Sequence, residues 1–187
     1  MQVKRQRLAA RPEIILEAAA AVLLKAGVRG LTIDAVAAEA GLSKGGVLHH
    51  YASKDALVVA LVARKLADVR EEIAACAAAI PAGPSQFPKA MVAHVRGHYC
   101  EDNESARALL LASMESPEAQ KGFQAFVVDQ LDQLGQIDGA RPGEGSVLFF
   151  AILGLFMSRA LGFHQLGEDS LVPMLDALDR IASRTDG

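Results

Sequence analysis

Apolar residues recur at helical spacing from the start of the chain, and glycine interrupts the pattern. The first segment, Pro12–Ala26, places apolar residues at i, i+3, i+4, i+7 and i+11, which predicts an amphipathic helix. Pro12 is tolerated in a first helical turn, and Gly27 favours a stop. The apolar positions of this predicted helix are Ile15, Ala18, Ala19, Val22 and Ala26.

Two short helices are predicted next, joined by a turn that contains glycine. Thr32 is a suitable N-cap for the first, and Asp34 in its first turn complements the helix dipole. Gly41 ends this helix, and Ser43 caps a second one that runs to about His50. The arrangement is that of a helix-turn-helix, whose second helix enters the major groove of DNA.

The remaining segments predict helices as well. Ser53 caps a long helix that reaches about Ala79, and the Pro/Gly-rich stretch Pro81–Ser85 separates it from a second region. The pattern therefore predicts an all-α fold of about nine helices, with a three-helix head and a C-terminal helical bundle. Five helices are expected in the second region, at Phe87–Cys100, Ser105–Met114, Pro117–Leu134, Ser146–Gln165 and Ser170–Ser183.

Composition and charge narrow the class of protein. A chain with 51% hydrophobic and 22% charged residues is not disordered. Its net charge is −3, yet residues 1–54 carry eight Lys/Arg against four Asp/Glu. This asymmetry favours a polyanion-binding head on an acidic body, and an ordinary fluctuation of charge is the alternative.

Nothing in the sequence indicates secretion or a membrane span. The basic N-terminus lacks the apolar core of a signal peptide, and the longest apolar run, Val147–Met157, is too short to cross a bilayer. Cys76 and Cys100 are too far apart for a metal motif and are compatible with a reducing compartment. We therefore expect a cytoplasmic protein.

The segment Gly30–Val62, "GLTIDAVAAEAGLSKGGVLHHYASKDALVVALV", resembles the signature of tetracycline-repressor (TetR)-like bacterial transcription regulators. The resemblance covers roughly residues 9–69 and implies a helix-turn-helix DNA-binding domain there, with the motif at about 32–51. It also implies a C-terminal regulatory and dimerisation domain, expected at 85–184. The matching positions are Thr32, Ile33, Val36, Ala37, Gly41, Leu42, Ser43, Gly45, His50, Ser53, Lys54, Asp55 and Leu57.

The resemblance directs the choice of DNA-contacting residues. Helix N-termini attract phosphate, a lysine beside a cap reaches bases or phosphates, and glycines permit close approach to DNA. Each role has a structural alternative. Thr32 and Ser43 could act only as caps, Lys44 could simply be solvated, and His50 could pack within the head. The candidates are Thr32, Ser43, Lys44, Gly45, Gly46, His49, His50, Tyr51 and Lys54.

Two positions depart from the family pattern. Leu48 stands where the family often has an aromatic residue, and Tyr51 replaces its usual phenylalanine. A leucine cannot bind phosphate as a tyrosine at this position can, so His49 is the expected phosphate contact instead. Tyr51 is expected to pack in the core with its hydroxyl at the edge. Further upstream, a basic arm (Lys4, Arg5, Arg7 and Arg11) either enters the neighbouring minor groove or is a frayed terminus.

The resemblance implies a homodimer formed through the last two long helices. Ser146–Gln165 is apolar on nearly all sides, more than the surface helix of a monomer requires. Ser170–Ser183 adds an apolar stripe of Leu171, Leu175, Leu178 and Ile181/Ala182, so two subunits would form a four-helix interface. Packing in the core of one subunit is the alternative for some of these residues, but not for every face. A dimer suits a palindromic operator with recognition helices about 34–36 Å apart.

Polar groups on the apolar stripes of the C-terminal region are candidates to line an effector pocket. Such a pocket would be mainly apolar and would suit a small hydrophobic or aromatic ligand. His94 and His98 are four residues apart and suggest a metal site, but no third ligand has convincing spacing, so we expect no metal. Packing of these histidines in an interhelical core is the other alternative. The candidates, with Phe87 beside them, are Met91, His94, Val95, His98, Tyr99, Met114, Phe123, Phe126, Phe149, Leu153 and Phe156.

These observations predict a sequence-specific DNA-binding transcriptional regulator. The expected form is a homodimeric repressor that a small hydrophobic ligand releases from a palindromic operator. A ligand-binding or enzymatic helical bundle is the competing class, but the sequence shows no nucleophile–base pair, phosphate loop or metal cluster that supports it. No cofactor and no enzymatic activity are expected.

Overall fold

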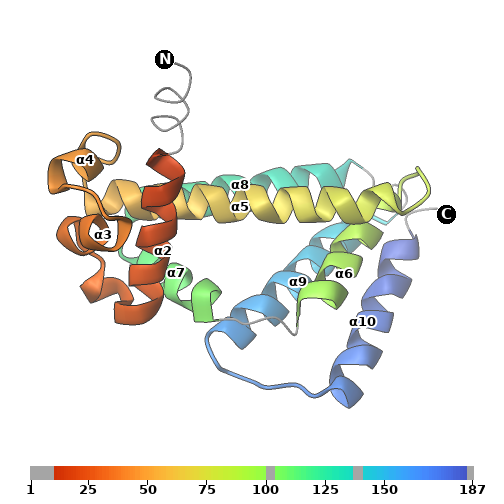
Figure 1. Cartoon of the computed structure of the whole chain (residues 1–187). Coiled ribbons are helices and arrows are strands. Elements are labelled where there is room, and N and C mark those ends of the chain that lie inside the picture. Colours follow the sequence, from red (N-terminus) through yellow and green to blue (C-terminus); the bar gives the residue numbers. More distant parts are fainter. Residues whose placement is uncertain (1–10, 100–103, 137–140, 185–187) are drawn as a thin grey trace. The chain divides into compact units, whose positions relative to one another are not determined.

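The computed structural model describes residues 11–99, 104–136 and 141–184, apart from the side chains of Arg11 and Glu168. Within these ranges all regular structure is helical, which confirms the predicted all-α fold. Figure 1 shows the elements along the chain. They are α2 (Arg11–Gly30), α3 (Ile33–Ala40), α4 (Lys44–Leu48), α5 (Lys54–Ala78), α6 (Gln86–His98), α7 (Glu104–Met114), α8 (Pro117–Gly135), α9 (Glu144–Ala160) and α10 (Glu168–Ser183).

The helices form two compact units whose boundaries do not follow the order of the sequence. Unit 1 comprises residues 1–65 and 104–123, and unit 2 comprises residues 66–103 and 124–187. Helix α7 and the start of α8 therefore pack with the N-terminal helices, although they fall inside the range 85–184 expected for the regulatory domain. The contacts between α7 and α2 place α7 in unit 1.

The core of unit 1 is built from the apolar stripes of its helices. Helix α2 packs against α3 and α7 (Figure 1). Four of the five residues in the predicted α2 stripe are buried, whereas Ala26 is exposed next to the helix break. The fully buried side chains in the other parts of the head are Leu31, Val36, Val47 and Leu57.

Several predicted helix ends are displaced for identifiable reasons. Gly27 breaks α2 as expected, with φ 65° and ψ −172°, but one further turn follows it and reaches Gly30. Helix α4 stops at Leu48 rather than His50. Helix α9 stops at Ala160 rather than Gln165, because Gly162 adopts φ 75° and the Phe163 N–H donates back to the Ser158 carbonyl oxygen at 2.8 Å.

The turn between α3 and α4 depends on a left-handed residue. Gly41 has φ 64° and ψ 32°, and the Leu42 N–H donates to the Ala37 carbonyl oxygen at 2.9 Å. This pattern closes the last turn of α3 and turns the chain towards Ser43. A side chain at Gly41 would be strained by its backbone conformation, whereas a methyl group added at Gly45, inside α4, would have no atom within 4 Å.

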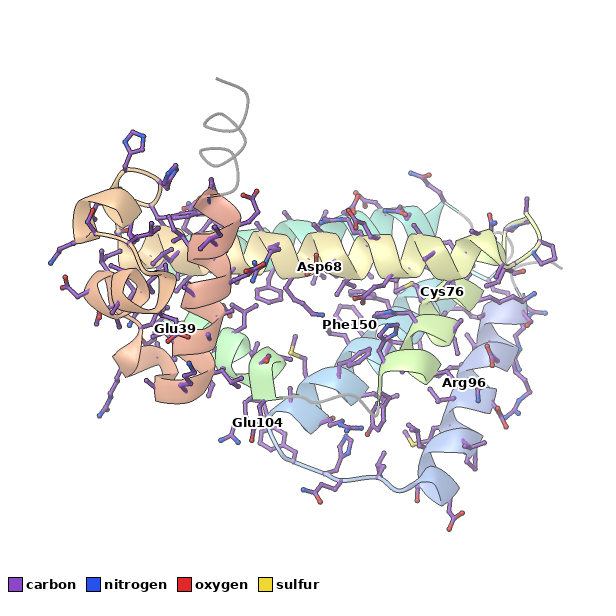
Figure 2. The ribbon with its side chains drawn as sticks, viewed as in Figure 1. Glu39, Asp68, Cys76, Arg96, Glu104 and Phe150 are labelled. Atoms are coloured by element: carbon purple, nitrogen blue, oxygen red, sulfur yellow. The ribbon has the colours of Figure 1, made fainter. Side chains whose placement is uncertain are left out.

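Unit 2 is a helical cluster in which α6 packs against α9 and α10. Met91, Val92 and Val95 from α6 are buried, as are Leu148 of α9 and Leu175 of α10. At the surface, Arg96 points from α6 to α10 (Figure 2), where its guanidinium lies 2.9 Å from Asp176 and 2.7 Å from Asp179. These hydrogen bonds raise the pKa of Arg96, so the cross-link between the two helices stays charged.

Unit 2 also contains Cys76, which is a free thiol, while Cys100 lies outside the described residues. None of the described helices is long and apolar enough to cross a membrane.

We expect opposite effects on stability from alanine at two nearby glycines. Gly41→Ala should lower the free energy of unfolding by about 1 kcal/mol, because a left-handed conformation costs a residue with a Cβ about that much. Gly45→Ala should raise it by up to about 1 kcal/mol, because alanine is the better helix former and the space is open. Urea denaturation followed by circular dichroism measures both, and a stabilised Gly41→Ala variant would contradict the turn geometry.

Candidate functional site

The two helices of the predicted motif are held by side-chain caps at their N-termini. The Thr32 Oγ1 accepts a hydrogen bond from the Ala35 N–H at 3.1 Å, and the Ser43 Oγ accepts one from the Gly46 N–H at 3.1 Å. Both residues precede their helices in extended conformation. The capping roles are therefore confirmed, and these caps set where α3 and α4 begin.

Helix α4 has one buried anchor and a small exposed surface. Val47 is fully buried, while Lys44, Gly45, Leu48 and His49 are exposed. A methyl group at Gly45 would meet nothing within 4 Å, and one at Gly46 would lie 3.3 Å from the Ser43 Oγ. The leading end of α4 thus presents main chain and a lysine to solvent without large side chains around them.

Lys44 is paired with an acid on the preceding helix. Its Nζ lies 2.9 Å from the Asp34 Oδ2, and the two side chains are 59% and 69% exposed. An ion pair this exposed contributes about 0–1 kcal/mol to stability. Lys44 can therefore exchange Asp34 for another anion at small cost.

Lys54 has a different environment at the start of α5. Its Nζ donates to the Val28 carbonyl oxygen at 2.7 Å and lies 4.0 Å from the Glu115 Oε2. The Val28 carbonyl belongs to the last turn of α2, after the break at Gly27. Lys54 therefore ties α5 to the end of α2, in addition to any contact outside the chain.

The aromatic and histidine candidates lie around the turn after α4. The half-buried Tyr51 has its hydroxyl 3.5 Å from the Pro12 carbonyl oxygen, and its pKa is raised by burial and by Glu13, against a lowering by Arg64. The His49 ring is exposed and its centroid lies 5.0 Å from that of half-buried His50. Leu48, at the family's aromatic position, is 40% exposed.

All nine candidate DNA-contacting residues thus lie in unit 1, on or beside α3, α4 and the start of α5. Ser43, Lys44, Gly45 and His49 are exposed, and Thr32 is too, whereas Tyr51 and Lys54 make contacts with α2. Of the basic arm, Lys4, Arg5 and Arg7 lie outside the described residues, as does the side chain of Arg11.

The candidate effector residues divide between the units. Met114 and Phe123 belong to unit 1, where Met114 is 64% exposed. The other candidates belong to unit 2, where most are buried in the helical core. The buried members are Met91, His94, Val95, Tyr99, Phe126 and Phe149, and the half-buried ones are His98, Leu153 and Phe156.

Part of this set forms a cluster of rings in unit 2. The His94 ring centroid lies 4.6 Å from that of His98 and 5.9 Å from that of Phe156. Tyr99 stands 6.5 Å from Phe156, and the Arg159 guanidinium lies 4.4 Å above the Tyr99 ring. The helical spacing in α6 therefore does bring polar handles to an aromatic environment.

Unit 2 also has a groove, and of its lining residues the sequence pattern had singled out only Phe87. Its volume is about 310 Å³, near the lower end for small-molecule sites. Gln130 is only 2% exposed, and its side-chain amide oxygen, Oε1, has no hydrogen-bond partner within the described residues. Glutamines and alanines in a helix give no sequence signal for a pocket. The lining residues are Arg70, Ile73, Ala74, Ala77, Gln86, Phe87, Gln130 and Gln133.

A second arrangement missed in the sequence is a hydrogen-bonded chain through His164. Its Nε2 lies 2.8 Å from the Ser158 Oγ and its Nδ1 3.4 Å from the Tyr99 hydroxyl. The Ser158 hydroxyl also lies against the carbonyl oxygens of Gly154 and Leu155 in the preceding turn of α9. These hydrogen bonds tie the loop after α9 to Tyr99 at the end of α6.

Two family models match the chain. The model "Bacterial regulatory proteins, tetR family" matches residues 15–61, and "Tetracyclin repressor-like, C-terminal domain" matches residues 85–183. The first covers the caps, the turn and the exposed face of α4. No curated protein matches the chain in sequence.

Solved structures share the fold at low sequence identity. A TetR-family member from Streptomyces coelicolor A3 (SCO1917) is 22% identical, with TM-score 0.63, and the match covers 95% of this chain and 98% of that one. The multidrug-binding protein EbrR complexed with malachite green is 20% identical, with TM-score 0.70 and coverage of 94% and 97%. The SmeT–triclosan complex is 22% identical, with TM-score 0.67 and coverage of 94% and 91%.

The different environments of Lys54 and Lys44 lead to a stability prediction. Lys54→Ala should lower the free energy of unfolding by about 1–2 kcal/mol, because it removes a charge-assisted hydrogen bond to the α2 carbonyl. Lys44→Ala should change it by less than about 1 kcal/mol, because it removes only an exposed ion pair. Urea denaturation of the two variants tests this order, and equal effects would show that the Lys54 contact does not support the fold.

Proposed function

Because this chain belongs to the tetracycline-repressor (TetR) family of bacterial regulatory proteins, we propose that it is a homodimeric repressor that binds a palindromic operator. In this proposal residues 9–69 form the DNA-binding domain and residues 85–184 the regulatory domain. A small hydrophobic ligand releases the protein from DNA. The protein acts by binding and has no catalytic role.

The exposed leading end of α4 is the observation that carries the DNA-binding proposal. It combines a capped N-terminus, Lys44 and the open surface of Gly45 on a helix anchored by Val47. Small residues let the main chain approach a groove closely, and a helix N-terminus favours phosphate. We propose that Thr32, Ser43, Lys44, Gly45, Gly46 and His49 face DNA.

The remaining candidates have a supporting role in this proposal. Tyr51 and Lys54 contact α2, so they position α4 and α5 and offer only their remaining exposed surface to phosphates. His50 is half-buried next to His49 and joins the contact at its edge. The excess of basic residues in positions 1–54 favours attraction of DNA to this end of the chain.

Exposed apolar side chains on α9 and α10 support the proposed dimer. Val147 and Phe150 on α9 are 63% and 53% exposed, and Val172 and Met174 on α10 are 45% and 42% exposed. Apolar groups on two neighbouring helices are a common feature of helical dimer interfaces. We propose that α9 and α10 of two subunits form a four-helix interface (Phe150 is labelled in Figure 2).

The effector proposal rests on unit 2. Its partly apolar groove has room for a small molecule, and a cluster of aromatic rings and histidines lies in the same unit. EbrR complexed with malachite green and SmeT complexed with triclosan have the same fold, and both of those ligands carry aromatic rings. We propose an effector of this chemical class, which favours a conformation with low affinity for the operator.

Lys44→Ala should weaken binding to the promoter region of the protein's own gene by about tenfold, because a direct contact to DNA is worth about 1–3 kcal/mol. Lys25→Ala is the matched control, since Lys25 is also exposed in unit 1 and also pairs with an acid, Glu39, at 2.8 Å. Fluorescence anisotropy at several salt concentrations gives the affinities and the salt dependence.

Two outcomes of this experiment have different meanings. Equal affinities of Lys44→Ala and the unsubstituted protein would remove Lys44 from the interface and leave the function standing. Absence of salt-dependent binding, both to this promoter region and to a random-sequence duplex library at low salt, would refute the DNA-binding function itself.

Phe150→Glu should raise the dissociation constant of the dimer by tenfold or more, because it places a charge in an apolar interface. Val128→Glu is the control, since Val128 on α8 has a similar exposure of 56% against 53% for Phe150. Sedimentation velocity over a range of concentrations measures the association. Equal dissociation constants for the two variants would place the interface elsewhere.

A further inference from the structure

Unit 2 brings a third potential metal ligand to the histidine pair of α6. Glu72 comes from α5, and one ligand atom each of Glu72, His94 and His98 lies within 4.8 Å of the other two. The sequence alone did not suggest Glu72, because it precedes His94 by more than twenty residues on another helix. We propose that these three side chains form a binding site for a divalent transition-metal ion of the zinc type.

The donor set fits this class of ion. Two imidazoles and one carboxylate are a known three-ligand set for Zn²⁺, which leaves a fourth position open to water or another small ligand. Imidazole nitrogen disfavours Mg²⁺ and Ca²⁺, which prefer oxygen. The two neutral rings and the single carboxylate leave a net charge of +1 when a divalent ion binds.

The tautomer of His98 is already suitable for coordination. Its Nδ1 lies 2.9 Å from the His94 carbonyl oxygen. Because a carbonyl oxygen only accepts hydrogen bonds, Nδ1 carries the hydrogen, and Nε2 of the neutral ring holds the lone pair. Metal-binding histidines are commonly oriented by such a hydrogen bond from their other ring nitrogen.

The positions of the other two ligands also agree with a metal site. The His94 Nδ1 lies 3.6 Å from the Glu72 Oε2, and the His94 side chain is 7% exposed against 34% for that of Glu72. The ligand atoms of tetrahedral Zn²⁺ are separated by about 3.4 Å. Side-chain movements of about an ångström would therefore bring these ligand atoms to the separation that the ion requires. Glu72 and His98 are only half-buried, so solvent reaches the site, and the Phe156 ring centroid lies 5.9 Å from that of His94.

A cobalt titration of the metal-stripped, untagged full-length protein tests this site. We expect one equivalent of Co²⁺ to bind with a dissociation constant of about 1 µM or tighter. The visible absorption should be that of a four- or five-coordinate ion, and Zn²⁺ should displace it. Glu72→Gln and His98→Gln should each weaken binding by about tenfold or more, because each removes one ligand.

The exposed pair His49 and His50 provides a matched control. Its ring centroids are 5.0 Å apart, close to the 4.6 Å between His94 and His98. Among the described residues, however, His49 and His50 are not grouped with a third potential metal ligand. A variant with glutamine at both positions should bind Co²⁺ as the unsubstituted protein does. Loss of binding in this control, with Glu72→Gln and His98→Gln unaffected, would overturn the proposal.

A measurement on the unsubstituted protein guards against variants that fail to fold. The chain has five histidines, so their ring signals can be followed by NMR during addition of Zn²⁺. We expect the signals of His94 and His98 to shift at one equivalent and those of His49, His50 and His164 to stay. Unshifted His94 and His98 signals would refute the site, and neither experiment depends on DNA binding.

Discussion

The burial of Val47 is the interaction on which the presentation of α4 depends. A helix of five residues with two adjacent glycines has too little intrinsic stability to persist by itself. Val47 has no exposed surface, and its carbonyl oxygen accepts hydrogen bonds from the His50 and Tyr51 N–H groups at 3.0 and 2.9 Å. With the core side of the helix fixed in this way, Ser43 needs only to cap it. The outer surface is then free of any packing role, which is why glycine is tolerated there.

The head shows how far residue patterns can predict a fold. The caps at Thr32 and Ser43 and the left-handed turn at Gly41 follow from local chemistry, since each residue type suits its backbone position. The end of α4 at Leu48 was less predictable, because His49 and His50 do not carry a strong stop signal. The contact between Lys54 and the Val28 carbonyl was not predictable, since it depends on how α2 continues past its break at Gly27.

In unit 2 the sequence could not predict the features that depend on contacts between residues far apart in the chain or on where a helix ends. Helical spacing places His94 and His98 on one face, but only the packing of α5 beside α6 reveals Glu72 next to them. Ser158 and His164 are close in sequence, yet their hydrogen bond requires α9 to end at Ala160, several residues before the predicted end. The groove beside Gln130 follows from several small and polar side chains together, none of which is distinctive alone.

The path of the chain between the two units has a consequence for how this architecture can be divided. The polypeptide passes from unit 1 to unit 2 near residue 65, returns near 104 and leaves again near 124. Helix α7, which packs on α2, is therefore separated from it in sequence by a segment of unit 2. A fragment that ends after α5 would expose the surface of α2 that α7 covers. Helices α2, α3 and α4 are thus not a transferable module by themselves, and recombination between relatives would have to exchange α7 together with them.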